Sequence, residues 1–244
     1  MRGEAHVFGS DENVRMRPIA VPFSGDLLKM SNRSDFGMTS TNAALAIPRK
    51  EPKQRRSRAT VDAILTATAQ VLVDRGYDKA TTNQIAKRAG VSIGSLYQYF
   101  PNKEALVTAL CQRHSETVCQ NIVDRLGSTQ NLPLPLALRG LIKLLLAHHA
   151  EDPELHRVLI EQVPRLSGFE QLAQINCLLV DTITSDLARR REPLRPKNLE
   201  MAAFILVHAV QAVTHAAVLD RPEALDDEAL ADEIVDLVQR YLVE

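Results

Sequence analysis

Apolar side chains recur with a helical period between Val61 and Val73, at positions spaced by three and four residues. This spacing places them on one face of a helix. Gly76 follows the last of them, and glycine commonly ends a helix because it adopts a left-handed backbone at little steric cost. The pattern therefore predicts a first helix that ends at Gly76.

Two short helices joined by a tight turn are predicted next. Thr81 and Gln84 have the spacing of a capping box at the start of a helix of about two turns. Gly90 permits the backbone to reverse, and Ser92 caps a third helix that runs to about Tyr99. This arrangement is the helix-turn-helix pattern, in which the second helix of the pair enters the DNA major groove by its N-terminal end.

The rest of the chain predicts a larger helical body. A fourth helix from Glu104 to about Leu126 is long enough to leave the small domain. A loop over residues 127–135 precedes an apolar helix that ends near Ala150, and Pro153 opens a shorter one. Further helices are expected over residues 168–191, 197–219 and 226–242. The fold class is therefore all-α, with about nine helices in total.

Charge is divided unevenly along the 244 residues. The whole chain carries 29 Lys and Arg against 30 Asp and Glu, a net charge of −1. Residues 1–48 carry five basic and five acidic side chains, residues 49–104 carry eleven and five, and residues 105–244 carry thirteen and twenty. The segments thus net to 0, +6 and −7. A basic block fused to an acidic body indicates that the block binds a polyanion.

Two further groups of basic residues have simple interpretations. Arg56 and Arg58 belong to a basic arm before the first helix, which is a candidate for DNA contact or, alternatively, a solubilising linker. Arg189, Arg190 and Arg191 are expected to form a solvated helix end that also favours the helix dipole.

The segment TTNQIAKRAGVSIGSLYQYFPNKEAL, Thr81 to Leu106, resembles the DNA-binding signature of the TetR family of bacterial transcriptional regulators. The Gly-Val turn, the Leu-Tyr pair, the aromatic-Phe pair and the Asn-Lys-Glu run fall at the family's spacing without a gap. The resemblance implies a homodimer and DNA contacts from the second and third helices and from the start of the fourth. The positions that it implies are Thr82, Asn83, Ser92, Ile93, Gly94, Ser95, Tyr97, Tyr99 and Lys103.

Aromatic residues are concentrated in this segment. The chain has only ten Phe and Tyr, yet Tyr77, Tyr97, Tyr99 and Phe100 lie within 24 positions. We expect Phe100 to pack in the core of the small domain. The hydroxyl groups of Tyr97 and Tyr99 can reach phosphate oxygens, and core packing is the alternative for both.

The body contains just three aromatic residues, so a pocket there would be lined mainly by aliphatic side chains. Such a pocket favours an aliphatic or flexible apolar effector. A few polar groups among apolar ones can orient a ligand, and packing in the core is the alternative for each candidate. The candidate effector-binding residues are Phe169, Cys177, Phe204, His208 and Gln211.

The last two predicted helices suit an interface between two copies of the chain. The first is apolar nearly all round and rich in alanine, so it must be covered on both sides. The second has a clean apolar stripe that includes Ile234, Leu237 and Val238. A two-fold four-helix interface between subunits would cover both, and an ordinary monomeric core is the alternative.

Histidines are frequent in the body but are not expected to bind a metal. His149 and His156 are seven residues apart, as are His208 and His215. Seven residues span about 10.5 Å along a helix, which is too far for one ion to bridge. We therefore expect no metal site and no cofactor.

Other chemistry is equally unsupported by the sequence. Cys111, Cys119 and Cys177 lack CxxC spacing and are interpreted as packed thiols in a reducing cytoplasm. The longest apolar stretch, 201–219, is interrupted by polar residues and is read as a buried helix and not a membrane span. No catalytic triad, phosphate loop or paired-carboxylate motif stands out, so the chain is not expected to be an enzyme.

Three regions follow from these patterns. Residues 1–48 show no sustained period and are expected to be a disordered tail. Met16, Met30 and Met38 are candidate later start codons, and translation from one of them would leave part of this tail out of the natural protein. Residues 49–103 form the DNA-binding domain, and residues 104–244 form the effector-binding and dimerisation domain. The predicted function is a ligand-responsive repressor of a pseudo-palindromic operator. A regulator without an effector, and a helical scaffold or enzyme tethered to DNA, are the alternatives.

Overall fold

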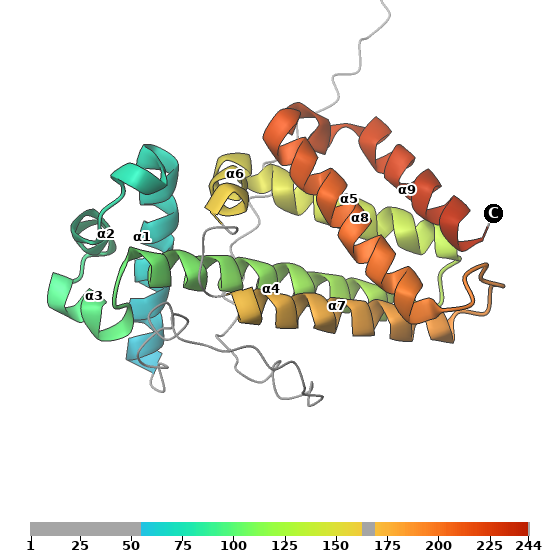
Figure 1. The fold of residues 1–244 in the computed structure, drawn as a ribbon, viewed down its shortest axis with the longest axis horizontal. Coiled ribbons are helices and arrows are strands. Elements are labelled where there is room, and N and C mark those ends of the chain that lie inside the picture. Colours follow the sequence, from blue (N-terminus) through green and yellow to red (C-terminus); the bar gives the residue numbers. More distant parts are fainter. Residues whose placement is uncertain (1–54, 163–168, 244) are drawn as a thin grey trace, which may run out of the picture.

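The computed structural model describes residues 55–162 and 169–243, and every regular element in these ranges is a helix (Figure 1). This result confirms the all-α fold class. The predicted tail, residues 1–48, lies outside the described residues. The elements are α1 (Arg55–Lys79), α2 (Thr82–Ala89), α3 (Ile93–Tyr99), α4 (Lys103–Thr129), α5 (Leu134–Glu151), α6 (Pro153–Gln162), α7 (Phe169–Arg189), α8 (Leu199–Asp220), the 3-10 helix η4 (Pro222–Asp226) and α9 (Glu228–Leu242).

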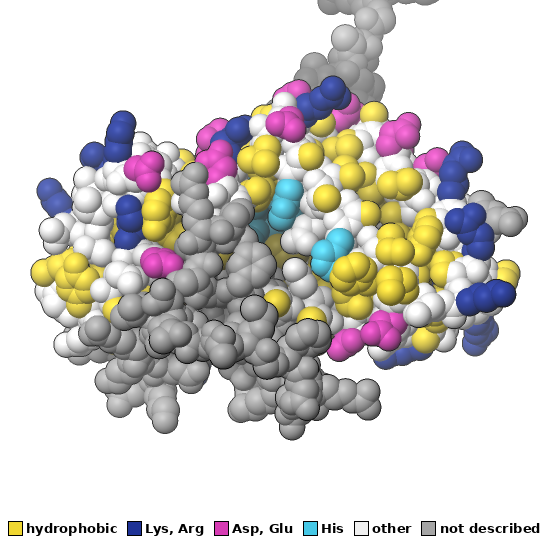
Figure 2. Space-filling model, in the orientation of Figure 1, with side chains coloured by type: hydrophobic (Ala, Val, Ile, Leu, Met, Phe, Trp, Pro, Cys, Tyr) yellow, Lys and Arg dark blue, Asp and Glu magenta, His cyan; other side chains and the backbone are white. Residues whose placement is uncertain are grey.

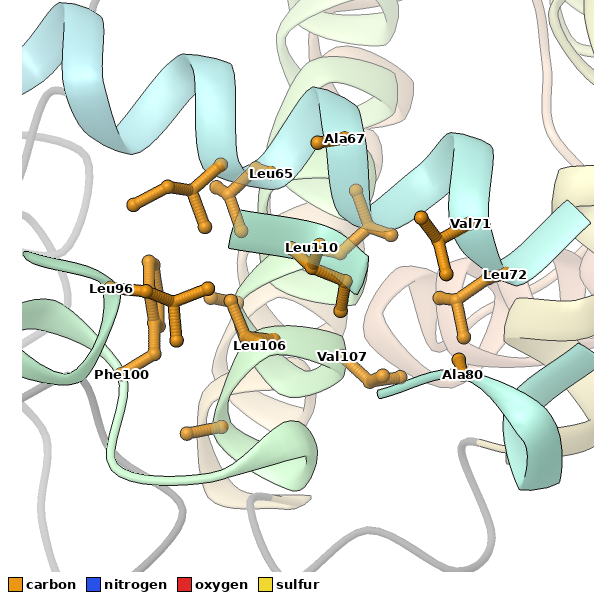
Figure 3. Packing of buried hydrophobic residues seen from close by; sticks show 14 of the residues in the cluster. Leu65, Ala67, Val71, Leu72, Ala80, Leu96, Phe100, Leu106, Val107 and Leu110 are labelled. Atoms are coloured by element: carbon orange, nitrogen blue, oxygen red, sulfur yellow. The ribbon is translucent and has the colours of Figure 1, made fainter. Parts of the chain in front are cut away.

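Helices α1, α2 and α3, with the start of α4, form a small unit around one apolar core (Figure 3). We call this unit of helices the reader. Leu65 and Leu72 of α1 are fully buried and belong to the same cluster as Leu96 of α3. Phe100, directly after α3, is buried there too, which confirms the expectation for this residue. Gly76 has a φ of 71°, so the helical geometry breaks where the sequence predicts a stop.

The first helix begins earlier along the chain than its apolar period indicates. Arg55 already starts α1, so Arg56 and Arg58 lie on its first turn and are not part of an extended arm. The expectation of an arm at these two positions is wrong because the helix continues N-terminal to the apolar period, where the described side chains of residues 57–60 are exposed or partly exposed. The side chain of Arg56 lies outside the described residues, and that of Arg58 is exposed.

Helix α4 connects the reader to the body as one element of 27 residues (Figure 1). It begins behind Asn102, whose Oδ1 accepts a hydrogen bond from the backbone N–H of Ala105 at 2.7 Å. Its first third, as far as Cys111, belongs to the reader core, whereas Cys119 and Ile122 belong to a core cluster of the body. Helix α4 therefore contributes buried side chains to the cores of both the reader and the body. The predicted loop after it shrinks to residues 130–133, because α4 and α5 both extend further than the apolar pattern indicates.

A second contact joins the body to the reader through α6. In the body, α5 packs on α4 and α9, and α7 packs on α4 and α8. Helix α6 packs on α8 of the body and also on α1 of the reader. Leu159 of α6 is buried in the reader core, and Leu155 and Val158 pack against that core. The reader is thus held by α4 and by α6.

Helix α8 buries one face and exposes the other. Ala202 and Ala203 are fully buried in the body, whereas Met201 and Phe204 are exposed, as is Leu237 of α9. Figure 2 shows the resulting apolar area on the side where α8 lies. Among the described residues α8 is also the one helix long and apolar enough to cross a membrane by length and composition alone. Within one chain, the apolar helix is therefore covered on one side only.

Candidate functional site

The turn between α2 and α3 is fixed by caps at the helix ends. The backbone N–H of Thr81 donates to Gln84 Oε1 at 3.1 Å, and the N–H of Gln84 donates to Thr81 Oγ1 at 3.3 Å, which completes the capping box. Gly90 has φ 68° and ψ 27°, a left-handed conformation. Ser92 Oγ then accepts from the N–H of Ser95 at 3.0 Å and starts α3. The predicted helix-turn-helix is therefore present.

One surface of α2 and α3 collects the residues that the family resemblance implies for DNA contact. Ile85 and Leu96 are fully buried and fix the opposite faces of these helices against the reader core. The implied residues lie away from that core: Asn83, Ser92, Ile93, Gly94 and Tyr97 are exposed, and Thr82, Ser95, Tyr99 and Lys103 are partly exposed.

A hydroxyl pair links α2 to α3 on this surface. Thr82 Oγ1 and Tyr97 Oη lie 3.0 Å apart, and Tyr97 is 41% exposed. Each hydroxyl can donate one hydrogen bond and accept others, so the pair keeps capacity for a phosphate oxygen. Tyr99 differs, because its ring packs against the reader core. For Tyr99, core packing accounts for most of the ring, and DNA contact stays a prediction.

Lys103 is already positioned by the reader. Its Nζ donates to the carbonyl oxygen of Tyr77 at 2.7 Å and lies 4.1 Å from the centroid of the Tyr77 ring. An ammonium group has three donors. The carbonyl takes one of them, so a phosphate contact from the same group stays possible and stays a prediction.

Three further polar residues share this region, and the sequence reasoning did not select them. Lys87 and Arg88 are exposed at the end of α2, and Gln98 is exposed on α3. Arg88 Nη1 forms an ion pair with Asp74 Oδ2 of α1 at 2.7 Å. Gln98 follows Tyr97 directly, and a side-chain amide can pair with adenine through two hydrogen bonds. Their polar side chains, inside the segment that resembles the DNA-binding signature, were the sequence feature that could have identified them as candidates for DNA contact.

A cavity of about 160 Å³ lies in the body, lined from α4, α5, α7, α8 and α9. Its wall is mainly aliphatic, with side chains such as Ile122, Leu141 and Leu179. Gln211 and the ion pair of Asp186 with Arg190 are among its polar groups. A mainly aliphatic wall with polar groups from several helices can hold and orient a small molecule.

Arg190 corrects an expectation from the sequence. Its Nε lies 3.0 Å from Asp186 Oδ2, and the two side chains are only 4% and 10% exposed. Its Nη1 also donates to the carbonyl oxygen of Leu132 at 3.1 Å. The expectation of a solvated side chain is wrong for Arg190, because the connection between α4 and α5 brings a backbone acceptor over the end of α7.

A second, more open cavity of about 990 Å³ lies beside the first and is lined from α4 to α8. Four of the five candidate effector-binding residues line it, from two different helices: Cys177 of α7, and Phe204, His208 and Gln211 of α8. The side chain of Phe169 lies outside the described residues. The structure thus brings four of the candidates to one cavity, and their role in binding stays a prediction.

Five histidines meet where α4, α5, α6 and α8 converge. The ring of His149 lies 4.7 Å from that of His156 and 5.9 Å from that of His215, measured between centroids. His148 stacks on His114 at 4.9 Å. The Nε2 atoms of His114 and His156 are 3.0 Å apart. We call His114, His148, His149, His156 and His215 the histidine cluster.

The expected separation of His149 and His156 is wrong. It treated the seven-residue interval as continuous helix, whereas α5 ends at Glu151 and Asp152 adopts φ −147° and ψ 74° before Pro153 opens α6. The turn folds α6 back so that the two rings face each other. The sequence pattern itself predicts a helix end near Ala150 and a helix start at Pro153, and the distance of about 10.5 Å along one helix left this break out.

Burial lowers the pKa of every member of the cluster. Desolvation is the largest cause for each, and the charges of neighbouring histidines lower the pKa further for all but His148. The pKa of His156 is lowered to about 3 and that of His215 to about 4. The cluster is therefore neutral at pH 7, with one ring lone pair on each imidazole.

The three cysteines differ in their surroundings. Cys111 and Cys119 are buried, and burial raises the pKa of the first thiol to about 12 and of the second to about 11. Both agree with the interpretation as packed thiols. That interpretation is wrong for Cys177, which is exposed because its side of α7 borders the open cavity.

Two family models match the chain. The one described as "Bacterial regulatory proteins, tetR family" matches residues 64–110, and the one described as "Tetracyclin repressor-like, C-terminal domain" matches residues 133–242. The first range covers the helix-turn-helix, and the second covers the body from the start of α5.

Curated relatives and solved structures are similar to the chain over different lengths. The HTH-type transcriptional activator FasR of Mycolicibacterium smegmatis is 30% identical over 148 residues, 59% of this chain and 65% of that protein. The uncharacterized HTH-type transcriptional regulator Rv2250c of Mycobacterium tuberculosis is 27% identical over 187 residues, which are 73% of this chain and 92% of that protein. The alignment with FasR thus spans just under two thirds of that relative. The crystal structure of a putative TetR-family regulator from Mesorhizobium loti has a TM-score of 0.62 at 19% identity, covering 79% of this chain and all of that one.

Proposed function

The chain belongs to the TetR family of bacterial regulatory proteins, and we propose that it is a ligand-responsive transcriptional repressor that binds operator DNA as a homodimer in the cytoplasm. The observation that carries the proposal is the polar surface of α2 and α3. The exposed start of α3, at Ser92, Ile93 and Gly94, is the end that a helix-turn-helix inserts into the major groove. The proposed activity is binding, with no catalytic step.

The contacts at this surface divide into two kinds. The hydroxyl groups of Thr82 and Tyr97, held 3.0 Å apart, suit phosphate oxygens and would set the register of the protein on DNA. Ile93 can pack on a thymine methyl group, and Gln98 can bond to adenine. Residues of α2 and α3 would therefore position the protein on the DNA backbone, and residues of α3 would contact the bases.

The dimer is supported by the uncovered apolar face of α8 and α9. Leu237 of α9 is 57% exposed, although it lies in an otherwise amphipathic helix. A second copy related by a two-fold axis would cover this face with the same face of its own. Two readers on that axis would match the two halves of a pseudo-palindromic operator.

Leu237→Arg should therefore convert the dimer to a monomer, measured by sedimentation at micromolar protein. The matched control is Leu136→Arg on α5, where the leucine is 58% exposed but lies outside the proposed interface. A wild-type chain that sediments as a monomer at this concentration would rule out the dimer.

The effector response is supported by the two cavities in the body and by the two connections to the reader. Helix α4 lines both cavities and continues into the reader core. Helix α6 lines the open cavity at Leu159 and Ile160 and packs on α1. An apolar effector that binds one arrangement of these helices better than the other would shift the population of reader positions and lower operator affinity.

Activation is the second candidate for the sign of regulation, because the relative that is 30% identical is named a transcriptional activator. A reporter fused to the promoter next to the bound operator distinguishes the two. Repression predicts higher expression when the protein is deleted, and activation predicts lower expression.

The decisive experiment measures binding of the full chain to the DNA upstream of its own gene by fluorescence anisotropy at several salt concentrations. Tyr97→Phe removes one hydroxyl and should weaken binding roughly three- to ten-fold, since a hydrogen bond contributes about 1 kcal/mol. Tyr241→Phe, on α9, is the matched control and should bind as the wild type. Absence of specific, salt-dependent binding would refute the proposed function.

A further inference from the structure

Three members of the histidine cluster are arranged like the ligands of a metal ion. One ring nitrogen of each of His114, His149 and His156 lies within 4.8 Å of the other two. They come from three helices, α4, α5 and α6. Ligand nitrogens around a tetrahedral ion with bonds near 2.05 Å are about 3.3 Å apart, so the widest pair has to close by roughly 1.5 Å. Side-chain rotation can supply this movement.

Backbone hydrogen bonds orient two of the rings with their lone pairs free. His149 Nδ1 lies 2.8 Å from the carbonyl oxygen of Leu145, and His156 Nδ1 lies 2.8 Å from that of Asp152. A carbonyl oxygen only accepts, so both Nδ1 atoms carry the proton and both Nε2 atoms carry the lone pair. An imidazole that donates its other N–H to a backbone carbonyl is the usual arrangement of a metal-bound histidine.

The third ring fits the same scheme. His156 Nε2 has to accept, so His114 Nε2 donates the hydrogen bond of 3.0 Å between them when no ion is bound. A shift of this proton to Nδ1 frees the His114 Nε2 lone pair as well. Three imidazoles would then face one point, and the change of tautomer moves a proton within His114 without releasing one.

The cluster is otherwise an unfavourable feature of the body. Buried polar groups normally have hydrogen-bond partners. The Nε2 atom of His148, adjacent to these ligands, is buried and has no partner among the described residues. Of the five imidazoles, those of His149 and His156 are buried and the other three are partly buried, so the cluster loses solvation free energy that a bound cation would offset.

An ion can reach this place from the open cavity. His114, His149, His156 and His215 all line the cavity of about 990 Å³. The cavity provides an access route and space for a fourth ligand, which a tetrahedral ion requires. His215 or a group from solvent could occupy that position.

We propose that His114, His149 and His156 bind one divalent transition-metal ion at the junction of α4, α5 and α6. The ligand set selects the class of ion, since imidazole nitrogen suits Zn²⁺, Cu²⁺, Ni²⁺ and Fe²⁺ and does not suit Mg²⁺ or Ca²⁺. The proposal is based on the positions of these histidines in the body and does not require that the protein bind DNA.

The test uses the full chain without an affinity tag, stripped with a chelator and dialysed. Titration with Co²⁺ at pH 7.5 should give one ion per chain and the visible absorption of a four-coordinate nitrogen site, and Zn²⁺ should displace it. Zn²⁺ should also raise the unfolding temperature. Absence of saturable one-to-one binding of either ion at micromolar concentration overturns the proposal.

Three variants locate the ion. His149→Ala and His156→Ala each remove one ligand and should weaken Co²⁺ binding at least about 100-fold. His208→Ala is the matched control, because His208 is also a histidine of the body but belongs to the exposed part of α8 and lies outside the cluster. Equal affinity in the wild type and both ligand variants, or an equal loss in His208→Ala, places the ion elsewhere and overturns the proposal. The wild-type titration decides the matter even if a ligand variant fails to fold.

Discussion

Replacing Arg190 by alanine should destabilise the fold far more than replacing Arg240, although both arginines pair with an aspartate four residues earlier. Each pair joins Nε to Oδ2, at 3.0 Å for Arg190 with Asp186 and at 2.6 Å for Arg240 with Asp236. The two pairs differ in their surroundings. The side chains of the first pair are 4% and 10% exposed, and those of the second are 74% and 55% exposed.

The magnitude follows from what Arg190→Ala leaves behind. Asp186 stays buried without its cation, and the carbonyl oxygen of Leu132 loses a donor. Breaking a buried pair by removing one partner costs about 3–5 kcal/mol of unfolding free energy. With a urea m-value of roughly 2–3 kcal/mol/M, the unfolding midpoint should fall by roughly 1–2 M. Arg240→Ala removes a pair that water already screens, so its midpoint should match that of the wild type.

The assay is equilibrium urea unfolding, followed by circular dichroism at one fixed protein concentration, because dimer dissociation would make the midpoint depend on concentration. The double variant Asp186→Ala, Arg190→Ala should recover part of the loss, since it removes the unpaired buried charge. If Arg190→Ala unfolds at the same urea concentration as Arg240→Ala, the reasoning from burial is refuted.

Four further outcomes are expected. Lys103→Met should weaken operator binding for all sequences and lower the slope of log affinity against log salt by about 1, measured by anisotropy; an unchanged slope would contradict the phosphate contact. Gly90→Ala should lower the free energy of unfolding by about 1–2 kcal/mol, because the positive φ of Gly90 is unfavourable for alanine although no neighbouring atom would meet the added methyl group. Gly127→Ala is the control, because Gly127 also has open space around it but lies in a helix, so this change should not lower the unfolding free energy. In metal-free protein, His156 and His215 have pKa values of about 3 and about 4 in the fold and near 6.5 when unfolded, so the unfolded chain binds more protons below pH 6.5. Stability should therefore fall from pH 6.5 towards pH 4, by up to about 1.4 kcal/mol per pH unit for each group, and a flat profile of urea midpoints would contradict this. Zn²⁺ at saturation should change operator affinity, since α6 carries His156 and packs on α1; an unchanged affinity would make the ion purely structural.

The reader was predictable because its signals are local. The Thr81 and Gln84 cap, the left-handed Gly90 and the Ser92 cap each act within four residues of chain, and each is present in the structure. The burial of Phe100 also followed from its place in the pattern. Where the reasoning failed in this region, at the start of α1, the helix continued beyond its apolar stripe, so periodicity carried no signal there.

The candidate site in the body was less accessible to sequence reasoning. Four candidate effector-binding residues do line one cavity, since α7 and α8 pack side by side. Cys177 is exposed and Arg190 is buried, both against expectation. In each case the side chain's surroundings come from an element distant in sequence, and helical period alone does not identify that element.

The sequence by itself determined the helical class, the position of the helix-turn-helix and the separation of a basic reader from an acidic body, because caps, apolar periods and charge are properties of short segments. Only the tertiary structure decided what those segments meet. The turn at Asp152 folds α6 onto α1 and brings His156 to His149 and His114, over 42 residues of chain between the first and last of the three. Contacts of this kind depend on how helices pack in space, and a linear pattern does not specify that packing.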